Sequence, residues 1–309
     1  PLRADRAGPA LRVSPPKDAG RVRVTGAARD AVAAWLAAIP AEGRVSGRSA
    51  NVSGREVILK AGPIRRRVRS GLRALAAGGR TPAELEFQHL TWLRKRLFRC
   101  VEPVAALSIR QRGLPVAQLF ASARIDGAEP LDAAWASAGD DRRAWLDELG
   151  TELARMHALA FVHADLYPRN ILVAPRAAPK SGRPSAIDPG PTDAGFGRAL
   201  VFLDCWAGGP SPWTRLRRTP VARDLGTFLT EAADWLDADE VGYLLGRYAL
   251  GRATQGRPVD DGGRWLARIL GVRRNEIARL AARPERLRGR ALPDPKWAPP
   301  PPRDLGLGS

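Results

Sequence analysis

Hydrophobic and polar positions follow two different rhythms along this chain. The stretch 43–63, "GRVSGRSANVSGREVILKAGP", alternates over short distances and is interrupted by Ser, Gly and Asn, which predicts a β-hairpin ending in the run "VILK". Residues 102–125 have the apolar content of two or three short strands. Further on, "DDRRAWLDELGTELARMH" has the period of a helix. Its apolar stripe consists of Trp145, Leu149, Leu153 and Met156.

The remaining pattern completes a two-part plan. Further helices are predicted at 28–40, from Thr81 to about Arg99, and around 222–237, 241–252 and 264–282, whereas 191–219 is rich in Gly and Pro and predicted irregular. Residues 1–20 are predicted to be disordered, 21–125 to form a small strand-rich lobe, 126–290 a larger helical lobe, and 291–309 a proline-rich tail. This predicts an α+β, two-lobed fold with a cleft between the lobes.

Composition adds a compartment to this plan. The chain has 309 residues, of which 44% are hydrophobic and 27% charged, as in ordinary globular proteins. No apolar run reaches the roughly 18 residues of a membrane span, and no secretory signal pattern opens the sequence. Two distant cysteines, Cys100 and Cys205, predict neither a disulfide framework nor a metal site, so we expect a reducing, cytoplasmic setting.

The net charge of +18 is carried by arginine, because only five of the 50 basic residues are lysine. A solvated surface shaped by coding bias is one interpretation, and an anionic partner such as phosphate groups, an acidic membrane face or nucleic acid is the other. No helix-turn-helix, zinc finger or aromatic RNA-binding signature occurs, so no specific nucleic-acid recognition is expected.

The strongest chemical signal is "HADLYPRN", residues 163–170, which contains one of three histidines and one of three asparagines in the chain. It lies between the long helix and the strand-like "ILV", so we expect a loop held by two rigid elements. An Asp followed five residues later by an Asn is typical of the loop in which kinase-like enzymes activate a hydroxyl and hold a metal ion. Alternatively, both residues only form turns.

Three further positions fit the same chemistry. "SAIDPG" places Asp188 eighteen residues after Asn170, as a second oxygen ligand for Mg²⁺ or as a plain Asp-Pro-Gly turn. Lys60 ends a predicted strand, where a compact ammonium could reach the α- and β-phosphates of a nucleotide or simply face solvent. The helix after Thr81 should supply the carboxylate that pairs with Lys60.

Two carboxylates of that helix compete for this role. "TPAE" is a capping box, in which Thr81 caps the helix and Glu84 reaches back to it. Glu86 instead shares a stripe with apolar residues, and a buried carboxylate needs a cationic partner. Glu86 is therefore the predicted partner of Lys60. Later in the chain, Asp224 stands where kinase-like proteins carry an Asp that holds the catalytic loop by hydrogen bonds to its backbone. The alternative is a plain helix N-cap or a charge at a helix start.

The order of these residues resembles the protein-kinase-like superfamily over roughly residues 43–285. Its details are most similar to the bacterial lipopolysaccharide kinase family, which phosphorylates Kdo or heptose of the inner core: Tyr167 two residues after Asp165, "RDL" in the late helix, no glycine-rich loop, and a basic stretch after the strand lysine. Two departures are visible, since proline follows Asp188 where kinases carry phenylalanine and no G-x-G-x-x-G precedes Lys60.

The resemblance implies an ATP-dependent kinase that uses Mg²⁺. It implies Asp165 as the catalytic base, Asn170 and Asp188 as metal ligands, and Lys60, fixed by Glu86, on the phosphates. His163 would brace the loop or, alternatively, act in acid–base chemistry. Arg169 would neutralise charge on the moving phosphoryl group or face solvent.

The implied acceptor is a sugar hydroxyl on an anionic glycan or glycolipid, with the enzyme in the cytoplasm or peripheral at the inner face of the membrane. The arginines at 65–73, 94, 96 and 99 are candidates for binding its phosphates. Two alternatives remain: a small-molecule or atypical serine/threonine protein kinase, and a pseudokinase that serves as a binding scaffold. The retention of Lys60, Asp165, Asn170 and Asp188 argues against the scaffold, which needs none of them.

Overall fold

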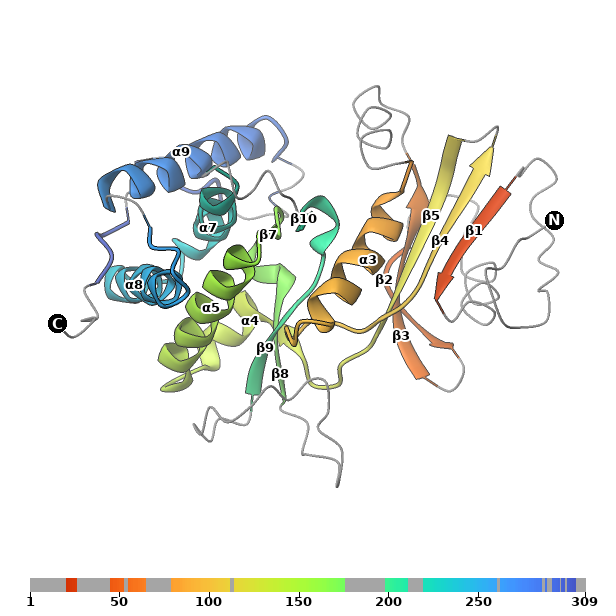
Figure 1. Cartoon of the computed structure of the whole chain (residues 1–309), viewed down its shortest axis with the longest axis horizontal. Coiled ribbons are helices and arrows are strands. Elements are labelled where there is room, and N and C mark those ends of the chain that lie inside the picture. The colour runs from red at the N-terminus through yellow and green to blue at the C-terminus, as the bar shows by residue number, and fades with distance from the viewer. Residues whose placement is uncertain are drawn as a thin grey trace. The chain divides into compact units, whose positions relative to one another are not determined.

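The chain folds into two compact units, Pro1–Asp126 and Gly127–Ser309, each of which combines helices with antiparallel strands (Figure 1). The predicted α+β class is therefore confirmed. The computed structural model describes residues 21–26, 45–52, 55–64, 79–111, 114–175, 198–210, 219–259, 262–284, 287, 291–294, 296–297 and 299–303. The segment 1–20 and the helix predicted at 28–40 lie outside these residues.

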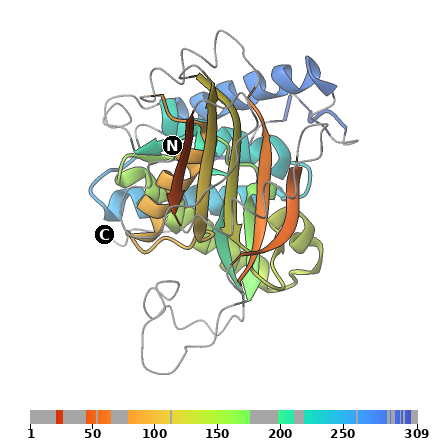
Figure 2. The ribbon, with the colours of Figure 1, turned by 90° about the vertical axis from the view of Figure 1, so that its right-hand side faces the viewer.

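The first unit is built on a five-stranded antiparallel sheet in the order β1-β4-β5-β3-β2, with β1 and β2 at its edges (Figure 2). The predicted hairpin is confirmed, and the region 102–125 forms two long strands. The strands are β1 (Arg21–Gly26), β2 (Val45–Val52), β3 (Arg55–Pro63), β4 (Pro103–Gln111) and β5 (Leu114–Ala123). Helix α3 (Pro82–Arg94) packs against β4 and β5.

Helix α3 begins as predicted and ends earlier than predicted. The capping box is present, because Thr81 Oγ1 accepts the N–H of Glu84 and the Glu84 carboxylate accepts the N–H of Thr81. The helix stops at Arg94 rather than near Arg99. There, the N–H of Phe98 bonds to the carbonyl of Leu93 and that of Leu97 to the carbonyl of Arg94, the pattern of a Schellman cap.

The cap explains why the sequence pattern overestimated the helix. Leu97 occupies the left-handed position with φ of 60°, a place usually taken by glycine, so no residue type announced the helix end. Phe98 is 1% exposed, and its burial beside the helix is what stabilises this ending. Leu97 itself is left 52% exposed.

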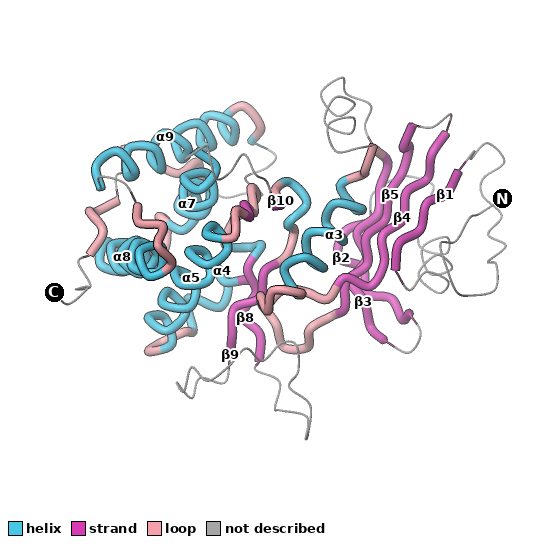
Figure 3. Tube along the Cα trace, in the orientation of Figure 1, coloured by secondary structure: helices cyan, strands magenta, loops and turns pink. Residues whose placement is uncertain are grey.

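The second unit is mainly helical (Figure 3). Its long helices are α5 (Asp141–Ala158), α7 (Thr219–Ala232), α8 (Ala238–Thr254) and α9 (Gly262–Ala281), and they pack as the pairs α5–α8 and α7–α9. These confirm the four helices predicted here, and the predicted stripe of α5 is buried. Shorter elements are α4 (Leu131–Ala134) and the 3₁₀ turns Trp135–Ser137, Pro168–Asn170 and Cys205–Ala207.

Two small sheets complete the second unit. Strands β6 (Glu129–Pro130), β8 (Ile171–Pro175) and β9 (Arg198–Phe202) form one, and β7 (Phe161–Val162) pairs with β10 (Gly209–Pro210) in the other. Strand β9 lies in the region predicted to be irregular, so that prediction was wrong there. The five residues "RALVF" carry the necessary apolar content, but the surrounding Gly and Pro obscured it.

Among the residues that the structure describes, no helix combines the length and the apolar character that crossing a bilayer requires.

Candidate active site

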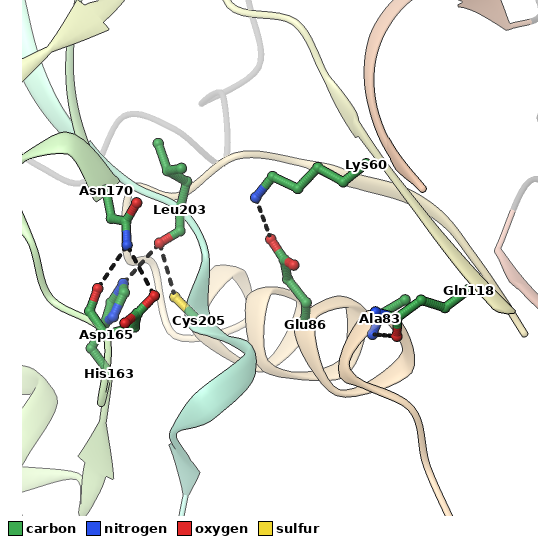
Figure 4. Close-up of polar contacts among 9 residues, drawn as sticks. All are labelled: Lys60, Ala83, Glu86, Gln118, His163, Asp165, Asn170, Leu203 and Cys205. Atoms are coloured by element: carbon green, nitrogen blue, oxygen red, sulfur yellow. Dashed lines mark hydrogen bonds and ion pairs between the residues drawn. The ribbon is translucent and has the colours of Figure 1, made fainter. Parts of the chain in front are cut away.

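Lys60 on β3 and Glu86 on α3 form an ion pair within the first unit. The Lys60 ammonium lies 3.2 Å from a Glu86 carboxylate oxygen and 5.8 Å from the centre of the Phe120 ring. Figure 4 shows the ammonium and the carboxylate pointing toward each other. The Glu86 side chain is only 5% exposed, whereas that of Lys60 is 29% exposed. The pair is the one predicted, and Glu84 is occupied in the helix cap and with Ser108.

The loop 163–170 of the second unit brings Asp165 and Asn170 together. The Asn170 side-chain nitrogen donates to the main-chain carbonyl of Asp165 at 2.8 Å and to its carboxylate Oδ2 at 3.3 Å. This fixes the amide so that its oxygen points away from Asp165 (Figure 4). The 3₁₀ turn Pro168–Asn170 sets the spacing between the two residues, because it brings the chain back within five positions.

His163 holds this loop to the segment that follows β9. Its Nε2 lies 2.8 Å from the carbonyl oxygen of Leu203, and since a carbonyl only accepts, Nε2 carries the proton. The ring is fully buried, and its Nδ1 has no hydrogen-bond partner in the part of the chain that is described. The contact is a bracing one.

Asp224 of α7 binds the backbone of the loop. Its carboxylate accepts the N–H of His163 and the N–H of Ala164, both at 2.7 Å, and it also meets His157 Nε2 at 3.0 Å. The other nitrogen of His157 is 2.9 Å from the Tyr248 hydroxyl. Asp224 lies inside α7 rather than at its start, so of the two predicted roles the loop-holding one is correct.

Burial alone would raise the pKa of Asp224. The hydrogen bond and charge of His157, together with contributions from His163, outweigh that effect and lower the pKa. The carboxylate is therefore ionised in its buried position and serves as an anchor for backbone N–H groups. Ala164 adopts a left-handed backbone with φ of 65°, which this anchor stabilises.

Asp204 is a residue that the sequence reasoning missed. It lies two residues after the end of β9 and has a left-handed backbone with φ of 64°. The Asn170 carbonyl accepts the N–H of neighbouring Leu203 at 3.1 Å, which ties the two segments together. Burial raises the pKa of Asp165, and the charge of Asp204 raises it further, so the two carboxylates are electrostatic neighbours. Recognising "RALVF" as a strand would have exposed this Asp.

Tyr167 and Arg169 point to the helices rather than to solvent. The Tyr167 hydroxyl donates to Glu276 of α9, and the Arg169 guanidinium pairs with Glu231 of α7 while lying 3.9 Å from the centre of the Tyr167 ring. The sequence predicted that Arg169 either contacts the phosphoryl group or faces solvent. It predicted neither Glu231 nor the Tyr167 ring as a partner. The described contacts of Arg169 fasten the loop to α7.

Several predicted positions lie outside the described residues, namely Asp188 and the arginines at 65–73. Of the other predicted phosphate-binding arginines, Arg94 donates to the Cys100 carbonyl, and Arg96 stacks 3.7 Å from the centre of the Trp92 ring. No group of three or more His, Cys, Asp and Glu side chains suited to a metal ion occurs within the described ranges.

These observations define a class of protein. A strand lysine paired with a helix glutamate, followed by a braced Asp–Asn loop and an Asp just after a strand, is the order of groups in kinase-like phosphotransferases. Residues 62–188, less than half of the chain, match the family described as "Lipopolysaccharide kinase (Kdo/WaaP) family". The resemblance drawn from the motifs is thereby confirmed over this segment, and it supports a kinase with a hydroxyl group as acceptor.

Solved structures show a weaker likeness. "WaaP in complex with acyl carrier protein" is 16% identical, covers 75% of this chain and 84% of its own, and has a TM-score of 0.49. The Rio2 kinase-ADP/Mg²⁺-phosphoaspartate complex from Chaetomium thermophilum is 16% identical and has a TM-score of 0.41. The match covers 67% of this chain and 60% of the Rio2 chain. A comparison with curated protein sequences found no match. The family match therefore carries the classification.

Proposed function

We propose that this protein is an ATP-dependent kinase that transfers the γ-phosphoryl group to a sugar hydroxyl of the lipopolysaccharide inner core, on Kdo or heptose. The observation that carries the proposal is the geometry of the 163–170 loop, in which Asn170 orients Asp165 while Asp224 fixes the backbone. A loop held this firmly suits a reaction in which positioning supplies much of the rate.

Asp165 is the proposed base. Asn170 occupies its Oδ2, so we assign acceptance of the hydroxyl proton to Oδ1. The raised pKa of Asp165, caused first by burial and then by Asp204, makes it a stronger base than an ordinary carboxylate. We assign His163 a bracing role rather than acid–base chemistry, because its proton-bearing nitrogen is engaged with a main-chain carbonyl.

Lys60 is the proposed contact for the α- and β-phosphates of ATP. Its partly exposed ammonium can reach an anion, and the buried Glu86 carboxylate holds the side chain in one direction. Glu86 is thus a positioning residue. Arginine would not replace Lys60 well, because a guanidinium is broader and its fork would seek both carboxylate oxygens of Glu86.

A divalent ion, proposed to be Mg²⁺, would neutralise phosphate charge when it is bound with the nucleotide. The residues present fit such an ion. The Asn170 amide oxygen is turned away from Asp165, and Asp204 places a carboxylate close enough to raise the pKa of Asp165. We therefore add Asp204 to the predicted ligands Asn170 and Asp188, and we expect it to be the stronger carboxylate ligand.

The proposed acceptor and location both involve anionic groups. An anionic glycolipid acceptor and peripheral binding at the inner face of the membrane fit the net charge of +18. Arg169 is not assigned to this acceptor, because its described partners are Glu231 and the Tyr167 ring.

The test is transfer of labelled phosphate from ATP to core oligosaccharide, protein and small-molecule acceptors. Asp165→Ala should lower the rate by roughly 10²–10⁴-fold and leave nucleotide binding intact. Asp126→Asn is the control, because its side chain is 90% exposed. Transfer only to protein or small molecules would replace the proposed acceptor, and nucleotide binding without turnover would favour the scaffold.

The metal assignment has its own measurement. Asp204→Asn should raise the Mg²⁺ concentration needed for half-maximal rate by about tenfold or more, because it removes one anionic ligand. Asp188→Asn provides the comparison. If only Asp188→Asn alters the metal dependence, the assignment of Asp204 is wrong.

A further inference from the structure

The end of the chain binds a buried arginine of the second unit. Arg273 on α9 is 1% exposed, and within the described residues its hydrogen bonds go to main-chain carbonyls. Nε donates to Leu229 of α7 at 3.2 Å, and Nη1 donates to Asp294 at 2.7 Å and Trp297 at 3.4 Å. The Trp297 ring lies 4.7 Å from the guanidinium.

The terminal segment supplies hydrogen-bond acceptors that offset the cost of burying the Arg273 guanidinium. Burial lowers the pKa of Arg273, and the charges of Asp234 and Asp294 only partly offset that effect. A buried guanidinium remains protonated and needs acceptors for its donors. Of its three carbonyl partners among the described residues, two are Asp294 and Trp297, so removal of this segment would leave one of these three.

One helical turn further along α9, Glu276 holds the loop 163–170. Its side chain is 8% exposed and accepts a hydrogen bond from the Tyr167 hydroxyl, while Arg279 pairs with its other oxygen. Residues three apart share a helix face, so Arg273 and Glu276 move together as α9 moves. Glu276 also raises the pKa of Asp165, which places it close to the proposed base.

Helix α7 packs closely against α9 and restricts how far α9 can slide along it. A Cβ atom on Gly226 would lie 2.8 Å from both the Ile269 carbonyl oxygen and Val272, so the two helix backbones are in close approach. If the Arg273 guanidinium lost its acceptors, it could therefore reach water only through a shift or rotation of α9 as a rigid body. That motion would carry Glu276 away from Tyr167.

We propose that Glu276 is a positioning residue for the 163–170 loop and that the terminal segment 291–303, by binding Arg273, fixes α9 so that Glu276 meets Tyr167. The inference rests on the proposed function in one respect, namely that this loop is catalytic. The terminal segment is held at its far end as well, because the N–H of Arg303 donates to the Gly242 carbonyl at 2.9 Å.

The first test does not use activity. The chain has three tyrosines, so 3-fluorotyrosine labelling gives three fluorine signals, and Tyr167→Phe identifies that of Tyr167. A chain ending at residue 290, which loses the two main-chain acceptors, should shift the Tyr167 signal by more than its linewidth. Trp297→Ala keeps both acceptors and removes only the ring beside the guanidinium, so it should shift the signal by less. For Trp297→Ala, Tyr243 on α8 is the reference, because its hydroxyl partner is Asp147 of α5 and this variant keeps the contact of Arg303 with the neighbouring Gly242. An unchanged Tyr167 signal in Trp297→Ala and in a chain ending at residue 290 would overturn the proposal.

The second test is a kinetic cycle that compares the 309-residue chain with a chain ending at residue 290. Ending the chain at residue 290 should lower kcat about tenfold with little change in the KM for ATP, within the range for coupling carried by packed networks. In an Arg273→Met background, the same truncation should cost about threefold or less, since the buried cation that the segment satisfies is gone. Losses that simply multiply would contradict a path through Arg273.

Conservative variants separate positioning from general stability. Glu276→Gln keeps an acceptor oxygen for Tyr167 and should retain kcat within about threefold, whereas Glu276→Leu should match the larger loss of Tyr167→Phe. Equal losses of kcat in Glu276→Gln and Glu276→Leu would contradict the positioning role. If wild type transfers phosphate to no acceptor, the proposed function fails, while the fluorine signals still decide whether the terminal segment controls Tyr167.

Discussion

Asp224→Ala is the most informative single change in the second unit. The carboxylate is fully buried and accepts two main-chain N–H groups, from His163 and Ala164, at 2.7 Å each. Hydrogen bonds to a charged group contribute about 1.5–3 kcal/mol each, so their removal should cost roughly 3–6 kcal/mol. That is a large fraction of a total stability of about 5–15 kcal/mol.

Urea unfolding, followed by circular dichroism, measures this loss. With a slope of about 2 kcal/mol per M, a loss of 4 kcal/mol lowers the midpoint by about 2 M. Asp224→Asn retains one acceptor oxygen but turns an amide N–H₂ toward donors, so we expect it to lose about half as much. A role limited to the charge near a helix start would contribute only about 0.3–1 kcal/mol. A loss below 1 kcal/mol in Asp224→Ala would therefore refute the loop-anchoring argument.

The pH dependence gives an independent check on Asp224. Its pKa is lowered in the folded protein, so its stabilising contribution is present above the ordinary Asp value of about 3.9 and is lost as the pH falls through the folded-state pKa. The stability difference between wild type and Asp224→Asn should then shrink in acid. A difference that stays constant from pH 7 to pH 3 would contradict the lowered pKa.

Other expected outcomes follow from the same contacts. Asp165→Asn should abolish transfer yet raise the melting temperature at pH 7, because a raised carboxyl pKa means stability that is lost as the pH rises; a lower melting temperature would refute this. Asp204→Asn should move the acid limb of kcat/KM for the free enzyme to lower pH, since it removes a charge that raises the pKa of Asp165; a limb that stays in place would count against their proximity. Lys60→Arg should raise the KM for ATP about tenfold or more, and Glu86→Gln should do so less; an unaltered KM would remove Lys60 from the phosphate site. Burial raises the pKa of the Cys100 thiol to about 12, so iodoacetamide at pH 8 should modify it only on unfolding, as mass spectrometry would show; rapid labelling of the folded chain would contradict its burial.

Local patterns in the sequence were sufficient for much of the fold. The "TPAE" capping box, the apolar stripe of α5 and the hairpin before Lys60 depend on residues within a few positions of one another, so spacing alone predicts them. The pairing of Lys60 with Glu86 followed from a similar argument, because a carboxylate on an apolar helix face requires a cation.

The site was only partly readable in the same way. The spacing within "HADLYPRN" was enough to predict a loop carrying Asp165 and Asn170, and the turn at Pro168 realises it. Asp204 was missed because β8 and β9 are separated by a long segment rich in Gly and Pro, and strand pairing across such a separation leaves no local signal.

What the sequence alone determined is the identity and order of the reactive groups, and the helices and strands that carry them. The tertiary structure decided which buried charges meet. Asp224 reaches the loop backbone across 60 positions, and Glu276 reaches Tyr167 across 109. The physical reason is that a buried charge is stable only with partners, and those partners come from whichever segments packing brings close, whatever their distance along the chain.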